Sequence, residues 1–165
     1  IAGLNIAYVP ENMGIFADLT VKENMLLAAR SAKRANQMDE ARLQWIFKLF
    51  PAVEKFWNHP AGKLSGGQKQ MLAVSRAIVE PRDLLIIDEP SKGLAPVMIN
   101  NMIDAFQQLK ASGVTILLVE QNINFAKRLG DTVAVMDDGR VVHAGSMQAL
   151  AQDEALQRSL LGLAL

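Results

Sequence analysis

Two short runs of apolar residues, separated by the length of one helix, limit the folds that this chain can adopt. The runs are Leu84–Asp88 and Val114–Glu120, and a third β-rich segment, Leu4–Val9, ends at Pro10. Apolar runs without polar alternation are typical of strands covered on both faces, as in parallel sheets. Because helical patterns separate these strands, the sequence predicts an α/β fold.

Helical periodicity and capping residues predict the elements that cover the strands. Thr20 and Glu23 form a capping-box pattern, which predicts a helix from Val21 to about Lys33 with Met25 on its buried face. The other predicted helices cover residues 39–50, 68–79, 97–112 and 123–129 and a segment that starts at the cap Ser146. Pro51 and residues 57–63 are predicted to be loop.

The order of these elements predicts how the chain is organised. Residues 20–63 contain helices but no strand, so we expect them to form an inserted α-helical subdomain. Asp138-Gly139 between two short strands predicts a β-hairpin, because Gly tolerates positive φ. The predicted divisions are 1–19 for a core strand and loop, 20–63 for the helical subdomain, 64–145 for the rest of the core and 146–165 for a C-terminal helix.

The segment Leu64-Ser65-Gly66-Gly67-Gln68 is typical of a helix start that binds phosphate. The two glycines allow the backbone to approach an anion closely, and Ser65 adds a hydroxyl donor. The helix that follows directs its N–H groups and positive dipole end toward that anion. An ordinary N-cap after a glycine turn is the alternative, and a second motif downstream argues against it.

That second motif is the pair Asp88-Glu89 at the end of the first apolar run. A buried strand places such acids at its carboxyl end, where α/β sheets bind ligands. Asp88 is expected to hold Mg²⁺, directly or through water, and Glu89 to orient or polarise an attacking water in phosphoryl transfer. Two solvated acids at a strand end are the alternative, which the following Pro90 and the turn over residues 91–96 make less favourable.

These motifs together resemble those of the ATP-binding cassette (ABC) ATPases, and the resemblance covers essentially all 165 residues. It implies a P-loop NTPase core with an inserted α-helical subdomain, and ATP and Mg²⁺ as cofactors. In the terms of that family, Leu64–Gln68 is the signature motif, Asp88 and Glu89 are the Walker B acids, Ser91–Ala95 is the D-loop region, Gln121 is the switch residue and Glu11 lies in the Q-loop.

Several positions depart from the commonest residues of that family and narrow the resemblance. Glu11, Ala95 and Gln121 stand where Gln, Asp and His are commoner, and this combination is similar to the ATPases of branched-chain amino-acid importers. Gln121 can donate an amide hydrogen bond to a γ-phosphate oxygen but cannot become cationic, so its contribution should depend little on pH. Glu11 would contact magnesium or water, or would only cap a turn. Lys92 is also less usual, since an apolar residue is commoner there.

The resemblance also implies partners and a location. A second ATPase subunit in a head-to-tail dimer and membrane permease subunits are the expected partners, with the protein cytoplasmic and peripheral on the inner face of the cell membrane. The chain has 17 basic and 17 acidic residues, so its net charge does not indicate nucleic-acid binding. It has no cysteine, which excludes disulfides and thiolate metal sites.

No G-x-x-x-x-G-K-[ST] occurs in the sequence, although this is the loop that holds the phosphates of ATP in P-loop NTPases. The chain begins with Ile1 rather than Met, and we expect the natural chain to begin earlier and the core to be incomplete at its N-terminus. Alone, the polypeptide is expected to bind ATP weakly and to hydrolyse it negligibly. We also expect it to self-associate, because Leu84–Ile87 would expose apolar faces and unpaired backbone groups.

Three functions stay open at this stage. The first is the ATP-binding and ATP-hydrolysing subunit of an importer, which couples hydrolysis to transport. The second is a non-transport ABC ATPase, and the third is a degenerate, non-catalytic binding module. The presence of Ser65, Asp88 and Glu89 favours a catalytic protein over the third.

Overall fold

Three parallel strands form the sheet that the apolar runs predict. The computed structural model describes residues 4–29 and 38–161. The strands are β1 (Ile6–Val9), β2 (Leu84–Asp88) and β3 (Thr115–Val119), in the order β1-β2-β3. β2 is therefore the central strand, paired in parallel with a neighbour on each side. The predicted α/β fold class is confirmed.

The two faces of this sheet differ in burial. Leu85 and Ile87 of β2 are 0% exposed, and Val9 of β1 is 1% exposed. On the opposite face, Tyr8 is 57% exposed and its neighbour two strands away, Leu117, is 53% exposed. The prediction of strands covered on both faces is therefore wrong for this chain, because its helices bury only one of them.

The prediction that Leu84–Ile87 leaves backbone groups unpaired is also wrong. All four residues have partners in β1 and in β3. The strands that pair on one side only, among the described residues, are β1 and β3.

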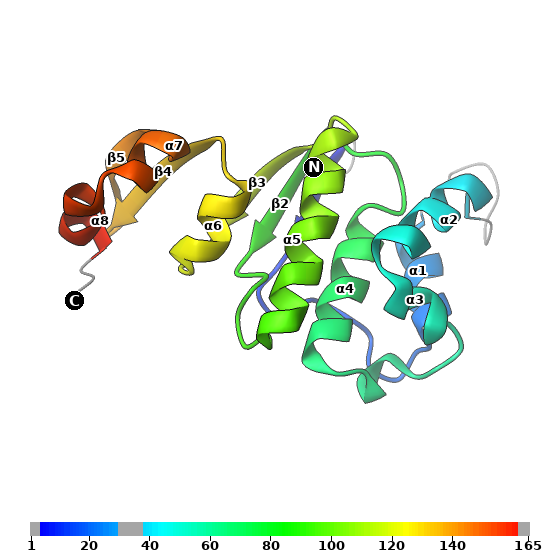
Figure 1. Cartoon of the computed structure of the whole chain (residues 1–165). Coiled ribbons are helices and arrows are strands. Elements are labelled where there is room, and N and C mark those ends of the chain that lie inside the picture. Colours follow the sequence, from blue (N-terminus) through cyan, green and yellow to red (C-terminus); the bar gives the residue numbers. More distant parts are fainter. Residues whose placement is uncertain (1–3, 30–37, 162–165) are drawn as a thin grey trace. The chain divides into compact units, whose positions relative to one another are not determined.

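Helices α4 (Gly66–Ala77) and α5 (Pro96–Ala111) lie alongside the sheet, and α1 (Val21–Ala28), α2 (Glu40–Leu49) and α3 (Pro51–Lys55) lie beyond α4 (Figure 1). A short 3₁₀ helix, η1 (Ala61–Lys63), precedes α4. The apolar stripe of α5 is buried through Met102, Ile103, Phe106 and Leu109. The burial of this stripe, together with that of Leu85 and Ile87, supplies hydrophobic stabilisation to this part of the chain.

The structure differs from the sequence-based prediction at the end of α1, at Pro51, and at residues 61–63, which form η1 instead of loop. α1 ends at Ala28 rather than near Lys33, because Ala29 is extended; residues 30–37 lie outside the described part of the chain. Pro51 is not loop but the first residue of α3. Proline is favoured at a first helical position because its missing N–H would have no intrahelical acceptor there.

A buried asparagine fixes the loop between β1 and α1. Asn24 is 0% exposed, and its Nδ2 donates to the carbonyl of Phe16 at 2.9 Å while its Oδ1 accepts from the Phe16 N–H at 2.9 Å. The predicted capping box is confirmed: Thr20 Oγ1 accepts from the Glu23 N–H, and the Glu23 carboxylate accepts from the Thr20 N–H. These bonds tie the end of the Glu11-bearing loop to the first turn of α1, through Phe16–Asn24 and Thr20–Glu23.

The chain forms two compact units, Ile1–Gln121 and Asn122–Leu165. The second contains α6 (Ile123–Leu129), the antiparallel strands β4 (Thr132–Asp137) and β5 (Arg140–Ser146), and helices α7 (Met147–Gln152) and α8 (Glu154–Leu161). The predicted hairpin is confirmed, with positive φ at Asp138 (44°) and Gly139 (73°). The four divisions predicted from sequence stay a prediction, since the compact units follow a different boundary.

The single predicted C-terminal helix is wrong, because the segment forms two helices. The break is at Asp153, whose carboxylate accepts from the Leu156 N–H at 2.9 Å and so begins α8. Ser146 stands at the N-cap position of α7, but its side chain makes no capping bond.

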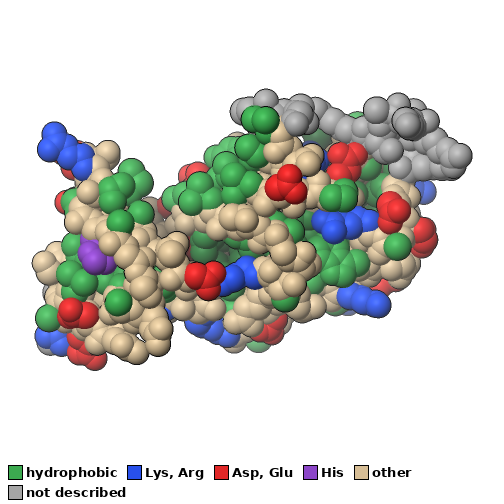
Figure 2. Space-filling model, turned by 90° about the horizontal axis from the view of Figure 1, so that it is seen from above, with side chains coloured by type: hydrophobic (Ala, Val, Ile, Leu, Met, Phe, Trp, Pro, Cys, Tyr) green, Lys and Arg blue, Asp and Glu red, His purple; other side chains and the backbone are tan. Residues whose placement is uncertain are grey.

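The surface carries no broad field of one charge on the face drawn in Figure 2, where Lys and Arg side chains are interspersed with Asp and Glu. Hydrophobic side chains reach the surface between them. Among residues 4–29 and 38–161, no helix has both the length and the apolar character needed to cross a bilayer.

Candidate functional site

The carboxyl ends of the three strands bring together residues that are far apart in sequence. Glu11 follows β1, Asp88 ends β2 and is followed by Glu89, and Gln121 follows β3. Since β1, β2 and β3 are parallel, these residues share one edge of the sheet.

Glu89 is held from three directions. Its backbone N–H donates to the Val119 carbonyl at 2.9 Å, which extends the β2–β3 ladder by one bond. Its φ is 46°, in the left-handed region that non-glycine residues rarely adopt. Of its carboxylate oxygens, Oε1 accepts from Gln121 Nε2 at 2.6 Å and Oε2 lies 3.1 Å from Lys92 Nζ. The side chain is 14% exposed, so these two groups are its main polar partners.

Lys92 links two of the predicted site residues. Its Nζ lies 2.5 Å from Glu11 Oε1 as well as 3.1 Å from Glu89 Oε2. Hydrogen bonds to Glu11 and then to Glu89 raise the pKa of Lys92, so the ammonium is charged at neutral pH. One cation therefore holds the two carboxylates together.

Asp88 lies beside this group, half-buried at the end of β2. Tyr8 Oη approaches its Oδ2 at 3.5 Å, the limit of a hydrogen bond. Among the described residues, no group of three or more His, Cys, Asp and Glu side chains could hold a metal ion. A single aspartate nevertheless fits Mg²⁺, which binds one or two carboxylates together with substrate phosphates and water.

The start of α4 forms a separate cluster. Ser65 is the N-cap: its Oγ accepts from the Gln68 N–H at 3.4 Å, while Gln68 Oε1 accepts from the Ser65 N–H at 2.9 Å. A Cβ on Gly66 would meet no atom within 4 Å, whereas a Cβ on Gly67 would lie 2.6 Å from Met98 Cε of α5. The first glycine leaves the helix end open to solvent, and the second allows α4 and α5 to pack closely.

The structure thus joins Gln121 to Glu89 directly and Glu11 to Glu89 through Lys92, and it places Asp88 next to them. Within the part of the chain that the structure describes, no hydrogen bond or ion pair connects this group with Ser65, Gly66, Gly67 or Gln68. Sequence reasoning noted Lys92 only as an unusual residue and did not place it in the site. Its position three residues after Glu89 was the available signal, but the link to Glu11 depends on the parallel pairing of β1 and β2.

Comparison with known proteins gives this arrangement a family. The sequence profile for the ABC transporter family matches residues 1–92. The high-affinity branched-chain amino acid transport ATP-binding protein BraG of Pseudomonas aeruginosa is 37% identical over 158 residues, which cover 96% of this chain and 67% of BraG. The probable branched-chain amino acid transport ATP-binding protein LivF of Archaeoglobus fulgidus is 35% identical over 97% of this chain and 67% of its own length.

Solved structures agree with these sequence relatives. A dimeric, post-hydrolysis structure of the ATP-binding cassette MJ0796 with ADP and Pi superposes with a TM-score of 0.73 at 26% identity. It covers 86% of this chain, and this chain spans 62% of that cassette. ATP-binding proteins of transporters for other substrates match as well. The chain therefore belongs to the ABC transporter family and has the fold of its ATP-binding cassettes.

Proposed function

We propose that this chain belongs to the ATP-binding and ATP-hydrolysing subunit of an ABC importer for branched-chain amino acids. The observation that carries the proposal is the contact of Gln121 with Glu89 at the strand ends, next to Asp88. A carboxylate at a strand end, with one oxygen hydrogen-bonded to an amide, can orient a water for phosphoryl transfer. The names of BraG and LivF support branched-chain amino acids as the substrate class.

In this proposal each residue has one task. Asp88 holds Mg²⁺, which when bound neutralises charge on the phosphates of ATP. Glu89 accepts a hydrogen bond from the attacking water, and Gln121 donates its amide to the γ-phosphate. Both carboxylate oxygens of Glu89 already have donors, namely Gln121 and Lys92. Each of these oxygens keeps a second lone pair, so Glu89 can still accept a hydrogen bond from the attacking water.

The other predicted site residues and the helical segment are assigned to a second ATPase subunit, to the permease and to the nucleotide-sensing loop. Ser65, Gly66, Gly67 and Gln68 lie at the N-terminus of α4, and we assign them to the ATP of a second ATPase subunit in a head-to-tail dimer, because an exposed helix start binds anions. Residues 20–63 are assigned to permease contact, which places the protein on the inner face of the cell membrane. Glu11 is assigned to the nucleotide-sensing loop, where its Oε1 lies 2.5 Å from Lys92 Nζ.

The polypeptide of 165 residues contains no G-x-x-x-x-G-K-[ST], so on its own it is proposed to bind Mg-ATP weakly and to hydrolyse it negligibly. Micromolar affinity in calorimetry would contradict this part without affecting the assignment of the parent subunit.

The decisive experiment measures ATP hydrolysis by the subunit that carries these residues, reconstituted with its permease in lipid vesicles. Leucine with its binding protein should stimulate hydrolysis, and arginine should not. Glu89→Gln should lower the hydrolysis rate by about a hundredfold or more, since it removes the charged carboxylate that orients and polarises the attacking water. The matched control is Glu154→Gln, which changes an exposed ion pair on α8.

Two results would favour the other functions. Hydrolysis that is independent of any permease would favour a non-transport ATPase. Hydrolysis unchanged by Glu89→Gln, or absent from the complete subunit, would favour a non-catalytic module.

A further inference from the structure

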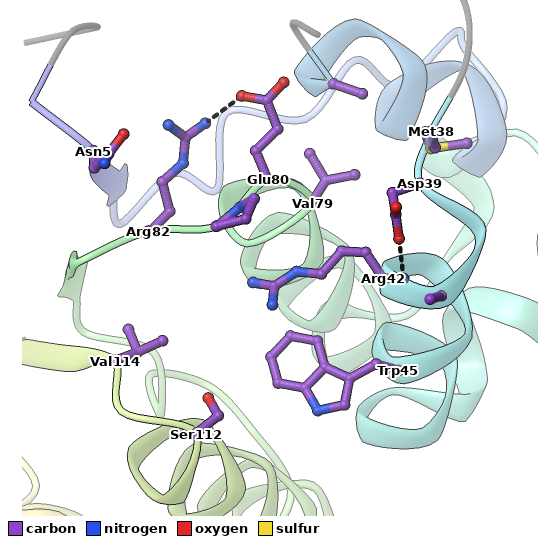
Figure 3. A pocket seen from close by; sticks show the side chains of 13 residues that line it. Asn5, Met38, Asp39, Arg42, Trp45, Val79, Glu80, Arg82, Ser112 and Val114 are labelled. Carbon is purple, nitrogen blue, oxygen red and sulfur yellow. Dashed lines mark hydrogen bonds and ion pairs between the residues drawn. The ribbon is translucent and has the colours of Figure 1, made fainter.

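The two ends of the three-stranded sheet differ in how their residues are paired. Beside the residues that precede the strands lies a cavity of about 1100 Å³, with Arg42 and Trp45 of α2 on its facing side (Figure 3). Its charged side chains pair locally: Glu80 lies 3.3 Å from Arg82, and the Asp39 carboxylate caps α2 beside Arg42. At the carboxyl ends, the residues that follow β2 and β3 bond to one another across the two strands, and these bonds determine where Glu89 lies.

The turn that carries Glu89 uses each of its backbone donors. The Lys92 N–H donates to the Glu89 carbonyl at 3.2 Å, which closes a four-residue turn with Pro90 at its second position. Pro90 has no N–H, and the Glu89 N–H donates to the Val119 carbonyl at 2.9 Å. The Ser91 N–H has no acceptor within such a turn, so its partner must come from outside it.

That partner is Glu120, the residue directly after β3. Its Oε1 accepts from the Ser91 N–H at 2.9 Å, across 29 positions of the sequence. Ser91 is only 6% exposed. A buried N–H that loses its acceptor is costly, and an ionised acceptor gives a stronger bond than a neutral one. The Glu120 carboxylate is therefore a strong tie between the end of β3 and the turn.

Three successive residues at the end of β3 thus hold the turn. The Val119 carbonyl takes the Glu89 N–H, the Glu120 carboxylate takes the Ser91 N–H, and the Gln121 amide donates to Glu89 Oε1 at 2.6 Å. The first tie is made by backbone atoms alone, and the third involves side chains that the proposed reaction uses. The tie of Glu120 can therefore be changed by itself.

The conformation of Glu89 makes these ties important. Its φ of 46° lies in the left-handed region, which costs a non-glycine residue free energy unless the surrounding structure enforces it. The bonds to Val119 and Glu120 fix the backbone on either side of Pro90. If the bond to Glu120 is lost, the turn can relax toward a more common conformation, and the Glu89 carboxylate then leaves its place beside Gln121.

We infer that Glu120 is a positioning residue for Glu89: it holds the Ser91 N–H and so keeps the Glu89 carboxylate against Gln121. The inference rests on the proposed function, in which Glu89 orients the attacking water. It divides the work after β3 between two neighbours, since Glu120 holds the backbone of the turn and Gln121 contacts the carboxylate itself.

Two substitutions of Glu120 test the inference in the reconstituted subunit. Glu120→Met keeps the length of the side chain but has no strong acceptor. It should lower kcat by about tenfold and change the KM for ATP by less than about twofold, because a misplaced Glu89 affects the attacking water rather than nucleotide binding. Glu120→Gln keeps an oxygen acceptor and should hold kcat within about threefold of the parent value.

A matched control separates this role from a merely structural one. The Asp153 carboxylate also accepts from a backbone N–H, that of Leu156 at 2.9 Å, at the start of α8. Asp153→Leu removes a bond of the same kind in the other compact unit. Urea unfolding should show a loss of stability in both Asp153→Leu and Glu120→Met, whereas only Glu120→Met should lower kcat.

The hydrogen bond itself is measured without ATP. Amide exchange in the chain of 165 residues, followed by NMR, reports on the Ser91 N–H. Exchange should be at least about tenfold faster in Glu120→Met than in the parent, as expected for loss of a bond to a charged acceptor. If Glu120→Met does not fold, Glu120→Ala replaces it in both measurements.

Three outcomes would overturn the inference while Glu89→Gln still lowers the hydrolysis rate. They are an unchanged kcat in a folded Glu120→Met variant, an equal loss of kcat in Glu120→Met and Glu120→Gln, and equal exchange of the Ser91 N–H in Glu120→Met and the parent. If Glu89→Gln itself leaves hydrolysis unchanged, the proposed function fails and the inference fails with it, so the two failures are distinguishable.

Discussion

At the scale of single residues, the site is defined by the contacts of Gln121 and Lys92 with the Glu89 carboxylate. Gln121 donates to one oxygen, Lys92 pairs with the other, and Lys92 also pairs with Glu11. The sequence identifies Asp88 and Glu89 as candidates because they come at the end of a recognisable strand, and Glu11 and Gln121 through the resemblance to the ABC ATPases. It does not identify the bridge, because Lys92 and Glu11 are 81 positions apart.

Replacement of Lys92 tests that bridge. Lys92→Gln releases the carboxylates of Glu11 and Glu89 from their shared cation, so Mg²⁺ should bind the nucleotide-free chain about fivefold more tightly, as expected for loss of one exposed charge. The bonds to Glu11 and Glu89 raise the pKa of Lys92. The difference between variant and parent should therefore be constant between about pH 6 and 9.

Calorimetry with MgCl₂ measures the affinity, and Lys48→Gln, on the exposed side of α2, is the control. Equal Mg²⁺ affinity in Lys92→Gln and in the parent would mean that the bridge does not hold the carboxylates in solution.

At the scale of elements, local sequence signals predicted most helices and strands. Thr20 with Glu23 forms the expected capping box, and Asp138-Gly139 forms the expected turn. Ser65 and Gln68 form a second capping box that the sequence reading did not predict. The errors arose where a residue has two local meanings. Pro51 breaks a helix but also starts one, and Asp153 is compatible with a helix interior but serves as a cap.

The capping box of α1 should make part of the stability depend on pH. The backbone and side-chain hydrogen bonds to Thr20 lower the pKa of Glu23. A lowered pKa in the folded state means that the contribution is fully present above the unfolded value of about 4.3 and is lost as pH falls through the folded value. Glu23→Gln should therefore remove the part of the acid-induced fall in the free energy of unfolding that comes from this carboxylate.

Urea unfolding at several pH values measures this difference. Thr20→Ala provides the comparison, because it removes the cap itself and should cost about 1 kcal/mol at neutral pH. Parallel curves of stability against pH for the parent and Glu23→Gln would contradict the capping role of the carboxylate.

At the scale of the whole molecule, one apolar face of the sheet is open to solvent. Tyr8, Leu117 and Val119 are each at least 50% exposed, and β1 and β3 each have one unpaired side among the described residues. Open strand edges and apolar faces favour pairing with another chain. This is the basis on which we expect self-association, in place of the unpaired β2 that the sequence suggested.

Leu117→Lys should shift the chain of 165 residues toward monomer. A charge at a half-exposed position of β3 opposes burial in an intermolecular contact, while the fold should lose little stability. Light scattering over a range of concentrations measures the mass, and Val97→Lys, at another exposed apolar position on α5, is the control. A monomeric parent chain at micromolar concentration would refute the expectation.

The sequence by itself determined the identity of the elements, because apolar runs, caps and turn residues act through neighbours in the chain. It also determined the family, through motifs in which each residue type has a fixed chemical task. Tertiary structure alone decided which face of the sheet is covered, how Lys92 joins Glu11 to Glu89, and where Arg42 meets Trp45 in a cavity. The covered face of the sheet and the Lys92 bridge depend on segments that only parallel strand pairing brings together. The cavity depends on the packing of α2 beside the first residues of the strands. No local pattern in the sequence encodes the distances between those segments.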